Sequence, residues 1–352
     1  MRSSETILQL FGRDLLAMDA SAREGSLENA FRYWRQAGFP YPQLCADEIA
    51  REFRLLQASH SIDILDNGKL KTATTGLRLA NSFHPQMWRV RSQQHRLSPI
   101  DYFNDDFCLR KALARAPRFW PNRRCWNSQC VRSLFRIYSS GRVANFRPLV
   151  ARAIVDRFSE PKSKVLDFSA GFGGRLLGSL TLERHYIGID PCRLQVNGMT
   201  NMLRALSKIS VGTAEIHYTP AEEFFPTLSS RSIDLVFSSP PFFNTEIYST
   251  DGTQSARRYP CYQEWVHSFL RILISEAHRV VRPGGFFIIN VANNRRFELR
   301  DDTLRLGIPL FGTPKVIEMM MHSRPMQRSN GSPTFRCEPL FVFKRRSVRN
   351  CI

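Results

Sequence analysis

The chain has 352 residues, of which 43% are hydrophobic and 23% are charged. This composition excludes a disordered chain, and the length exceeds what one hydrophobic core usually organises, so we expect two structural units. With 50 Lys and Arg against 31 Asp and Glu, the formal net charge is +19. Such an excess favours a polyanionic partner, and nucleic acid is the first candidate.

The first 18 residues interleave apolar side chains with charged ones, so they lack the continuous apolar core of a secretory signal. No uninterrupted apolar run approaches the ~20 residues that a membrane-spanning helix needs. We therefore predict a cytoplasmic, nucleoid-associated protein without a membrane partner. Its eight cysteines show no repeated short spacing, which predicts reduced thiols and no metal site.

Two helices are predicted near the N-terminus, over 26–36 and 46–58, on either side of a segment rich in proline and glycine. Two helices about a turn also occur in helix-turn-helix motifs that bind DNA. Here the connection is long and the segment is net acidic, so a packing role is favoured.

The positive charge is concentrated in the next part of the chain. Residues 67–147 contain 16 basic and 3 acidic side chains, whereas residues 1–66 contain 7 and 10. The same stretch is rich in aromatic residues, and cations together with aromatic rings can contact the phosphates and bases of a nucleic acid. Most aromatic residues of any fold lie in its core, so this prediction rests on the cations. The densest group is Arg115, Arg118, Arg123, Arg124 and Arg132.

After Pro148 short apolar runs alternate with helical spacing, as in a parallel sheet covered by helices. We place a boundary near residue 140, between an N-terminal region (1–140) and a second domain (141–346) with a short tail (347–352). A long helix is expected over about 265–277, ended by the Pro-Gly-Gly of residues 283–285. Strands are predicted over 164–168, 185–190, 214–218, 233–238 and 286–292, with an antiparallel pair over 316–320 and 339–343.

The first of these strands leads into a glycine-rich turn over 167–174. Its glycines allow a tight bend that brings backbone N–H groups close to a nucleoside ligand. The next strand ends in Asp190, 19 positions after Gly171, where a carboxylate can bind ribose hydroxyls. A dinucleotide-binding turn would have a third glycine where this chain has Leu176. A glycine turn alone serves a plain structural role as often as it binds a ligand. Together with Asp190, it indicates a nucleoside site.

The tetrapeptide Ser239-Pro240-Pro241-Phe242 follows the buried-looking strand over 233–238, at the edge of the sheet where ligands bind. Two consecutive prolines favour an extended backbone and lack N–H donors, so the carbonyls remain available as acceptors. A polar side chain before them and an aromatic ring after them are suited to holding a planar amine. Alone, the tetrapeptide would be interpreted as an ordinary proline-rich loop; it does not stand alone.

Together, these segments resemble the class I S-adenosylmethionine-dependent methyltransferases, and within them the DNA methyltransferases that modify cytosine N4 or adenine N6. The resemblance covers roughly residues 143–345. It implies an α/β fold with a Rossmann-like class I methyltransferase sheet, mostly parallel with an antiparallel last strand, after an N-terminal, mainly helical basic region. S-adenosyl-L-methionine is the implied cofactor and DNA the implied partner, with a cognate restriction endonuclease as a second one.

The resemblance also implies roles for single residues. The catalytic tetrapeptide is matched by Ser239, Pro240, Pro241 and Phe242, and an opening Ser is typical of cytosine-N4 enzymes. Phe242 stands where Tyr or Trp is usual, which preserves stacking but removes a hydroxyl. Among the cofactor residues Glu222 is a substitute, because proline occupies the position of the usual acid. The implied cofactor residues are Phe146, Asp167, Ser169, Gly171, Phe172, Gly173, Asp190, Glu222 and Ser238.

The same resemblance implies that the target base swings out of the duplex into the site. There Ser239 Oγ and the Pro240 carbonyl would accept hydrogen bonds from the base amine. The polar loop over 244–259 is placed to close over the base, with Tyr248, Arg257 and Arg258 as nucleic-acid contacts. A plain solvent-exposed loop is the alternative interpretation.

Three classes of function remain open at this point. The first is DNA amino-methylation, with cytosine N4 favoured and adenine N6 as the alternative. The second is methylation of RNA or of a protein amide, because related tetrapeptides occur there. The third is a nucleic-acid-binding protein that keeps the fold without the chemistry. The presence of both the glycine turn and the tetrapeptide argues against the third.

Overall fold

The computed structural model describes residues 6–60, 65–66, 69–92, 97–138, 144–249, 251–294, 296–321 and 336–347. The chain forms two compact units. Unit 1 comprises residues 1–43, 85–144 and 245–248, and unit 2 comprises residues 44–84, 145–244 and 249–352. The division differs from the predicted one chiefly in residues 44–84, which belong to unit 2, and in residues 245–248, which belong to unit 1. Near the predicted boundary at 140, the chain returns to unit 2 at residue 145.

The helix α3 (Ala46–Ala58) explains this difference. Its buried residues Phe53 and Leu56 pack in the same hydrophobic core as α8 (Pro148–Phe158) and α10 (Arg193–Leu206). The helical spacing correctly predicted α3 and its apolar face. Such spacing identifies a buried face but does not say which part of the chain covers it.

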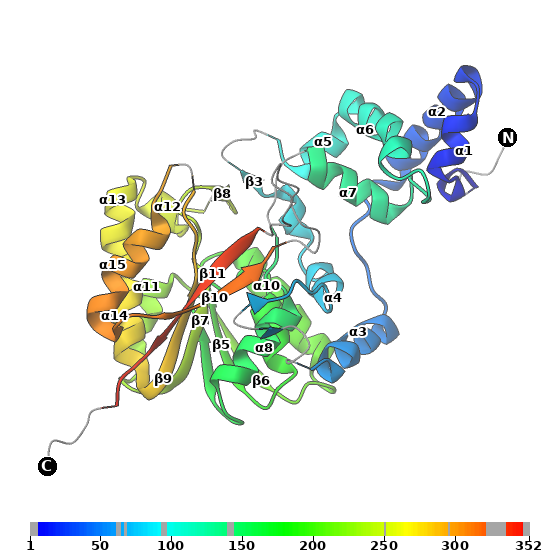
Figure 1. The fold of residues 1–352 in the computed structure, drawn as a ribbon. Helices are drawn as coiled ribbons and strands as arrows, with labels where there is room; N and C mark the ends of the chain where they lie inside the picture. Colours follow the sequence, from blue (N-terminus) through cyan, green and yellow to red (C-terminus); the bar gives the residue numbers. More distant parts are fainter. Residues whose placement is uncertain are drawn as a thin grey trace, which may run out of the picture. The chain divides into compact units, whose positions relative to one another are not determined.

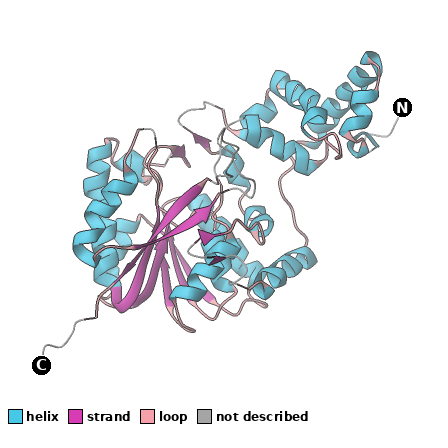
Figure 2. Cartoon of the chain, in the orientation of Figure 1, coloured by secondary structure: helices cyan, strands magenta, loops and turns pink. Residues whose placement is uncertain are grey.

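Unit 2 is built on a mixed sheet (Figures 1 and 2). Its strands are β1 (Leu65–Asp66), β2 (Lys69–Leu70), β4 (Lys164–Asp167), β5 (His185–Asp190), β6 (Thr213–Tyr218), β7 (Ile233–Ser238), β9 (Val281–Asn290), β10 (Lys315–Met320) and β11 (Cys337–Lys344). Their order is β1-β2-β10-β11-β9-β7-β4-β5-β6. The strands from β9 to β6 in this order are parallel, whereas β11 is antiparallel to both β9 and β10. The predicted mostly parallel sheet with an antiparallel last strand is confirmed.

Helices cover both faces of this sheet. One face packs against α3, α8 and α10, together with α4 (Leu77–Ser82) and α9 (Gly174–Leu180). The other packs against α11 (Ala221–Phe224), α14 (Arg271–Val280) and α15 (Leu299–Phe311). Alternate strand residues serve the two cores: Val165 faces the first and Leu166 the second. Unit 2 also contains η4 (Phe225–Thr227) and α12 (Ser255–Arg258).

The predicted long helix forms as three consecutive segments. These are α13 (Tyr262–Trp265), a π-helical turn η5 (Val266–Leu270) and α14. The helix ends at Val280, before the Pro-Gly-Gly segment, but that segment lies inside β9 instead of preceding it. Gly284 has a φ of 83°, and the register between β7 and β9 is interrupted here: Ile233 pairs with Val281 but Leu235 pairs with Phe286.

Unit 1 is mainly helical, as predicted. Asp19 begins α2 by accepting the N–H of Ala22 at 2.8 Å, which lengthens the predicted helix at its N-terminus. In the core, Trp34 Nε1 donates to the Trp126 carbonyl at 3.2 Å. The elements are η1 (Thr6–Gln9), α1 (Gly12–Ala17), α2 (Ala20–Ala37), η3 (Pro85–Arg89), β3 (Arg91–Ser92), α5 (Pro99–Asn104), α6 (Asp106–Phe119), α7 (Ser128–Tyr138) and β8 (Glu246–Ile247).

Two findings concern the whole described part of the chain. None of the helices described is both long and apolar enough to cross a membrane. The seven cysteines in the described ranges form no disulfide with one another, and Cys125 and Cys130 are both buried.

Candidate active site

Three neighbouring strands of unit 2 end at one edge of the sheet. Because β5, β4 and β7 are adjacent and parallel, their last residues Asp190, Asp167 and Ser238 all lie at this carboxyl edge. The glycine turn follows β4 and the tetrapeptide follows β7, so the structure brings the two predicted motifs together. Ligands of open α/β sheets bind outside this edge.

Asp167 is fully buried and forms the centre of a hydrogen-bond network. Its carboxylate accepts hydrogen bonds from Arg175 Nε at 2.7 Å, Tyr186 Oη at 2.6 Å and Ser238 Oγ at 2.7 Å. The N–H of Ser169 donates to it as well, at 3.2 Å. Because both oxygens are engaged inside the protein, the geometry favours a supporting role over direct ligand contact for Asp167 and Ser238.

Two members of this network were missed from the sequence. Burial, with Asp167 adding to it, raises the pKa of the Tyr186 hydroxyl far above its usual value, so the hydroxyl remains a donor. Arg175 is 5% exposed, and its guanidinium lies 5.3 Å from the ring centroid of Phe146. The signal available for Arg175 was a cation directly after the glycine turn, eight positions after Asp167.

The glycine turn leaves open space for a ligand. Gly171 and Gly173 have φ values of 57° and 70°, which only glycine adopts without strain. The Gly171 N–H donates to Asp190 Oδ2 at 2.8 Å, and the Cys192 N–H donates to Oδ1 at 2.9 Å. A Cβ on Gly171 would meet only the Ser169 carbonyl oxygen, at 3.8 Å. The side of the turn at Gly171 is therefore accessible, with Asp190 hydrogen-bonded to its backbone.

Asp190 has the chemistry of a hydroxyl-binding acid. Burial raises its pKa to about 7, and the N–H groups of Cys192 and Gly171 oppose this increase. Each carboxylate oxygen has more than one acceptor position, so Asp190 can accept hydrogen bonds from two neighbouring hydroxyls while it holds both N–H groups. The residues present thus fit the ribose of a nucleoside ligand.

Asn145 connects the segment before α8 to the glycine turn. Its Oδ1 accepts the N–H of Gly174 at 3.0 Å, and its Nδ2 donates to the Phe172 carbonyl at 2.8 Å. A Cβ on Gly174 would lie 1.9 Å from the Phe146 carbonyl oxygen, so only glycine permits this approach. The ring of Phe172 is buried and lies edge-on to His84, 5.6 Å between centroids. The ring of Phe172, a predicted cofactor residue, therefore packs in the core.

Ser239 is half-buried and is held by the end of the neighbouring strand β9. Its Oγ donates to the backbone carbonyl of Asn290 at 3.2 Å, with Asn290 Oδ1 at 3.4 Å. Asn290 Nδ2 donates in turn to the Pro339 carbonyl at 3.0 Å. Because the hydroxyl hydrogen points to Asn290, the lone pairs of Ser239 Oγ can accept hydrogen bonds from an amine. Asn290 was not predicted as a site residue.

Phe243, directly after the tetrapeptide, is a strained residue. Its φ is 56°, a left-handed conformation that costs a non-glycine residue about 1 to 2 kcal/mol. The buried ring lies against Tyr262, Trp265 and Phe297, with centroid distances of 5.4, 5.7 and 4.9 Å. This packing maintains the strain and so fixes the backbone direction after the half-buried Phe242.

Arg258 and Glu222 are partners of each other in the structure. Arg258 Nη1 lies 3.0 Å from Glu222 Oε1 and 2.8 Å from Glu223 Oε1. Glu222 was predicted to contact the cofactor and Arg258 to contact nucleic acid. Both contacts stay predictions, and in the structure each group already has an oppositely charged neighbour.

The other predicted loop contacts are divided between the two units. Tyr248 belongs to unit 1, where its hydroxyl is hydrogen-bonded to Glu246. Arg257 belongs to α12 in unit 2 and is exposed.

The predicted nucleic-acid contacts of the basic region all lie in unit 1. Arg132 is half-buried and donates through Nη1 to the Pro40 carbonyl at 2.8 Å, so it holds two segments of unit 1 together. The exposed members are Arg115, Arg118, Arg123 and Arg124.

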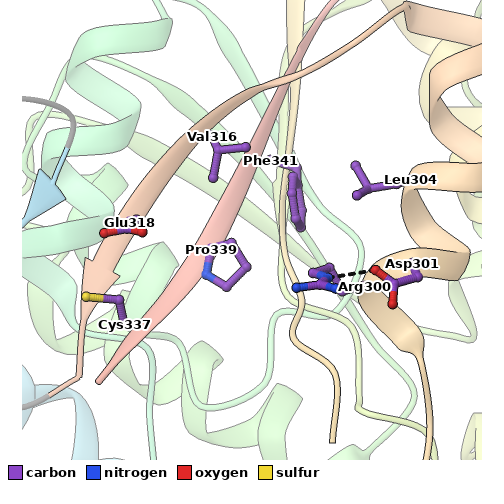
Figure 3. Close-up of a pocket in the computed structure, with 8 residues that line it drawn as sticks. All are labelled: Arg300, Asp301, Leu304, Val316, Glu318, Cys337, Pro339 and Phe341. Atoms are coloured by element: carbon purple, nitrogen blue, oxygen red, sulfur yellow. Dashed lines mark hydrogen bonds and ion pairs between the residues drawn. The ribbon is translucent and has the colours of Figure 1, made fainter. Parts of the chain in front are cut away.

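A pocket of about 420 Å³ lies between α15 and the strands β10 and β11 (Figure 3). It is lined by Arg300, Asp301, Leu304, Val316, Glu318, Cys337, Pro339 and Phe341. These residues differ from all the predicted site residues. Pro339 connects the pocket to Ser239 through Asn290, by the hydrogen bonds described above.

Comparison with known proteins gives structural neighbours only. No family model and no curated protein matches the chain. Similar solved structures include a methyltransferase from Pyrococcus furiosus (13% identity, TM-score 0.39, 57% of this chain and 83% of that chain). An O-methyltransferase from Thermotoga maritima shares 11% identity (TM-score 0.39, 61% and 71%), and an rRNA methylase from Streptococcus thermophilus shares 14% (TM-score 0.38, 57% and 98%).

The sheet of unit 2 itself defines the class of fold. Five parallel strands are followed by an antiparallel strand β11 that lies between β9 and β10. The sheet therefore has the α/β, Rossmann-like topology of the class I methyltransferase fold, as the sequence predicted.

Proposed function

We propose that the protein is an S-adenosylmethionine-dependent methyltransferase that acts on the exocyclic amine of a base in DNA, with cytosine N4 as the favoured acceptor. The observation that carries the proposal is the hydrogen bond from Ser239 Oγ to the Asn290 carbonyl, at the sheet edge that also holds Gly171 and Asp190. It leaves a serine oxygen free to accept from an amine. The opening Ser of the tetrapeptide favours cytosine N4 over adenine N6.

The residues at the edge fit the proposed cofactor. S-adenosylmethionine supplies an electrophilic methyl group on a sulfonium. Asp190 would accept hydrogen bonds from the ribose hydroxyls, and the accessible side of Gly171 would admit the ligand close to the backbone. Asn145 would hold the turn in its shape through Gly174 and Phe172.

The tetrapeptide would orient the acceptor amine. The nitrogen is a weak nucleophile because its lone pair is delocalised into the base ring. Ser239 Oγ and the Pro240 carbonyl would accept its two hydrogens in hydrogen bonds, which favours a pyramidal nitrogen with its lone pair directed at the methyl carbon. Phe242 would stack on the base after the base has left the helical stack. Alignment of this kind supplies much of the rate in a transfer between two bound groups.

The charge of the chain supports DNA as the partner. The net charge of +19 and the exposed Arg115, Arg118, Arg123 and Arg124 suit a phosphate backbone. We extend the proposal to a cognate restriction endonuclease as a second partner, by its resemblance to modification enzymes. Co-expression of the neighbouring reading frames and a cleavage assay on unmethylated DNA would test that part.

The test is methyl transfer by the purified protein with labelled cofactor. Duplex DNA, single-stranded DNA and RNA are supplied separately, and the nucleosides are identified by mass spectrometry. We expect N4-methylcytosine in DNA, and a loss of about 100-fold or more in rate for Ser239→Ala. Ser207→Ala is the matched control, since Ser207 Oγ also donates to a backbone carbonyl, that of Arg204 at 2.9 Å, at the end of α10.

The possible products separate the alternatives. If the product is N6-methyladenine, the acceptor base is adenine and the class of enzyme is unchanged. If label appears only in RNA, the substrate is RNA and not DNA. Full activity of Ser239→Ala would contradict the proposed role of the tetrapeptide. No transfer, together with no cofactor binding by calorimetry, would leave a nucleic-acid-binding protein without this chemistry.

A further inference from the structure

One face of α6 in unit 1 carries cations and aromatic rings side by side. With 3.6 residues per turn, positions 107, 111, 115 and 118 fall on one side of the helix, away from the buried Leu109, Ala112, Leu113 and Ala116. Phe107 is 71% exposed, and Phe119, at the last residue of α6, is 48% exposed. We call this exposed set, which spans about 18 Å at 1.5 Å per residue, the α6 stripe. The stripe consists of Phe107, Lys111, Arg115, Arg118 and Phe119.

Three acidic side chains near α6 have partners outside the stripe. Asp105 caps the start of α6 by accepting the N–H of Cys108 at 2.7 Å. Asp106 pairs with Arg35 at 2.7 Å, and Glu28 pairs with Arg110 and Arg32. The partners of these three acids lie outside the stripe, and the stripe itself contains no acid.

The aromatic residues of the stripe are what distinguish it from an ordinary solvated face. A single exposed apolar side chain is common and needs no explanation. Here one ring lies near each end of a cationic row, and Lys111 Nζ is 5.5 Å from the centroid of Phe107. Cations can contact phosphates while phenyl rings stack on bases whose faces are exposed. A duplex covers those faces, whereas an unpaired strand presents them.

We propose that the α6 stripe binds a single-stranded segment of nucleic acid. This deepens the proposed function, because it names the form of substrate that unit 1 holds, and it rests on nucleic acid being that substrate. Lys111, Arg115 and Arg118 contact the phosphates, and Phe107 and Phe119 stack on bases. The binding needs neither cofactor nor catalytic tetrapeptide, so it can be measured independently of methyl transfer.

The experiment uses the full-length protein and fluorescein-labelled 20-nucleotide probes, without cofactor. Single-stranded DNA, single-stranded RNA and duplex DNA of one sequence are compared by fluorescence anisotropy at several salt concentrations. We expect tighter binding of the single strands than of the duplex. Phe107→Ala should weaken single-strand binding about fivefold or more, and Arg118→Gln should lower the slope of log affinity against log salt by about 0.7.

Two variants outside the stripe serve as matched controls. Leu55→Ala removes an apolar side chain of α3 that is 59% exposed, and Lys208→Gln removes one exposed positive charge of unit 2. Both should bind the probes as the unchanged protein does. Because Phe107 and Arg118 are exposed, melting curves of their variants should match the unchanged protein.

The outcomes discriminate among the possible occupants of the stripe. Equal binding of duplex and single strands, with no effect of Phe107→Ala, would overturn the proposal. A preference for single-stranded DNA or for single-stranded RNA would identify which of the two nucleic acids the stripe binds. Strand binding without any methyl transfer would contradict the proposed function but support the stripe. Methyl transfer by the protein, together with normal strand binding by Phe107→Ala and Arg118→Gln, would support the proposed function but contradict the stripe.

Discussion

Ser238 Oγ donates a hydrogen bond to Asp167 Oδ1 at 2.7 Å, which joins the ends of β7 and β4. Asp167 also neutralises the buried Arg175, so this carboxylate supports both motifs of the candidate site. We predict that Asp167→Asn lowers the stability of unit 2 by about 3 to 5 kcal/mol, because it leaves a buried guanidinium uncompensated. Hydrogen exchange of the β4 and β7 peptides and thermal melting measure the loss.

The control for this variant is Asp301→Asn, which removes an exposed carboxylate paired with Arg300 at 2.7 Å. An exposed pair contributes between about 0 and 1 kcal/mol. Equal effects of the two substitutions would contradict the supporting role of Asp167.

Asp190 predicts a pH dependence of cofactor binding. Burial raises its pKa to about 7, whereas the unfolded chain has the ordinary value near 3.8. In the free protein, this group therefore favours folding below pH 4 and progressively less as pH rises to 7. The ionised carboxylate is the stronger acceptor for ribose hydroxyls, so we expect calorimetric affinity for S-adenosylmethionine to increase between pH 6 and 8. Asp190→Asn should bind more weakly and remove this increase; an unchanged pH profile would contradict the assignment.

Gly174 and Gly171 should respond differently to the same substitution. In Gly174→Ala the new Cβ would lie 1.9 Å from the Phe146 carbonyl oxygen, so the turn must distort and unit 2 should lose stability. In Gly171→Ala the space is open and only the φ of 57° opposes the change, at about 1 to 2 kcal/mol. That variant should fold but bind the cofactor poorly, since its methyl group occupies the accessible side of the turn.

Thermal melting and calorimetry separate these two effects. Gly252→Ala, where a Cβ meets nothing within 4 Å, is the control and should change neither quantity. Normal cofactor affinity in Gly171→Ala would place the ligand elsewhere.

Alanine substitutions of Phe243 and Phe242 should affect stability and activity differently. Phe243→Ala removes a buried ring from an aromatic cluster and should cost about 3 to 5 kcal/mol. Phe242→Ala should lower stability less, because the Phe242 ring is only half-buried. This variant should nevertheless lose most methyl transfer if the ring stacks on the base. Chemical denaturation and the transfer assay measure the two effects. Retained activity in Phe242→Ala would exclude the stacking role.

Local patterns were sufficient to predict much of unit 2. Strand length and apolar runs identified β4, β5, β6, β7, β9, β10 and β11, and the apolar face identified the long helix before β9, because these signals arise from neighbouring residues. The same signals placed the glycine turn and the tetrapeptide after β4 and β7. They misplaced the start of β9, since the strand continues through the Pro-Gly-Gly segment with an interrupted register to β7.

The sequence by itself determined which motifs exist and that both follow strands of one parallel sheet, because parallel strands end at a common edge. Only the tertiary structure decided what each polar group contacts. Arg175, Tyr186 and Ser238 all converge on Asp167, Asn290 accepts from Ser239, and Glu222 pairs with Arg258. Most of these partners are far apart along the chain, and hydrogen bonds and ion pairs depend on distances that packing alone sets.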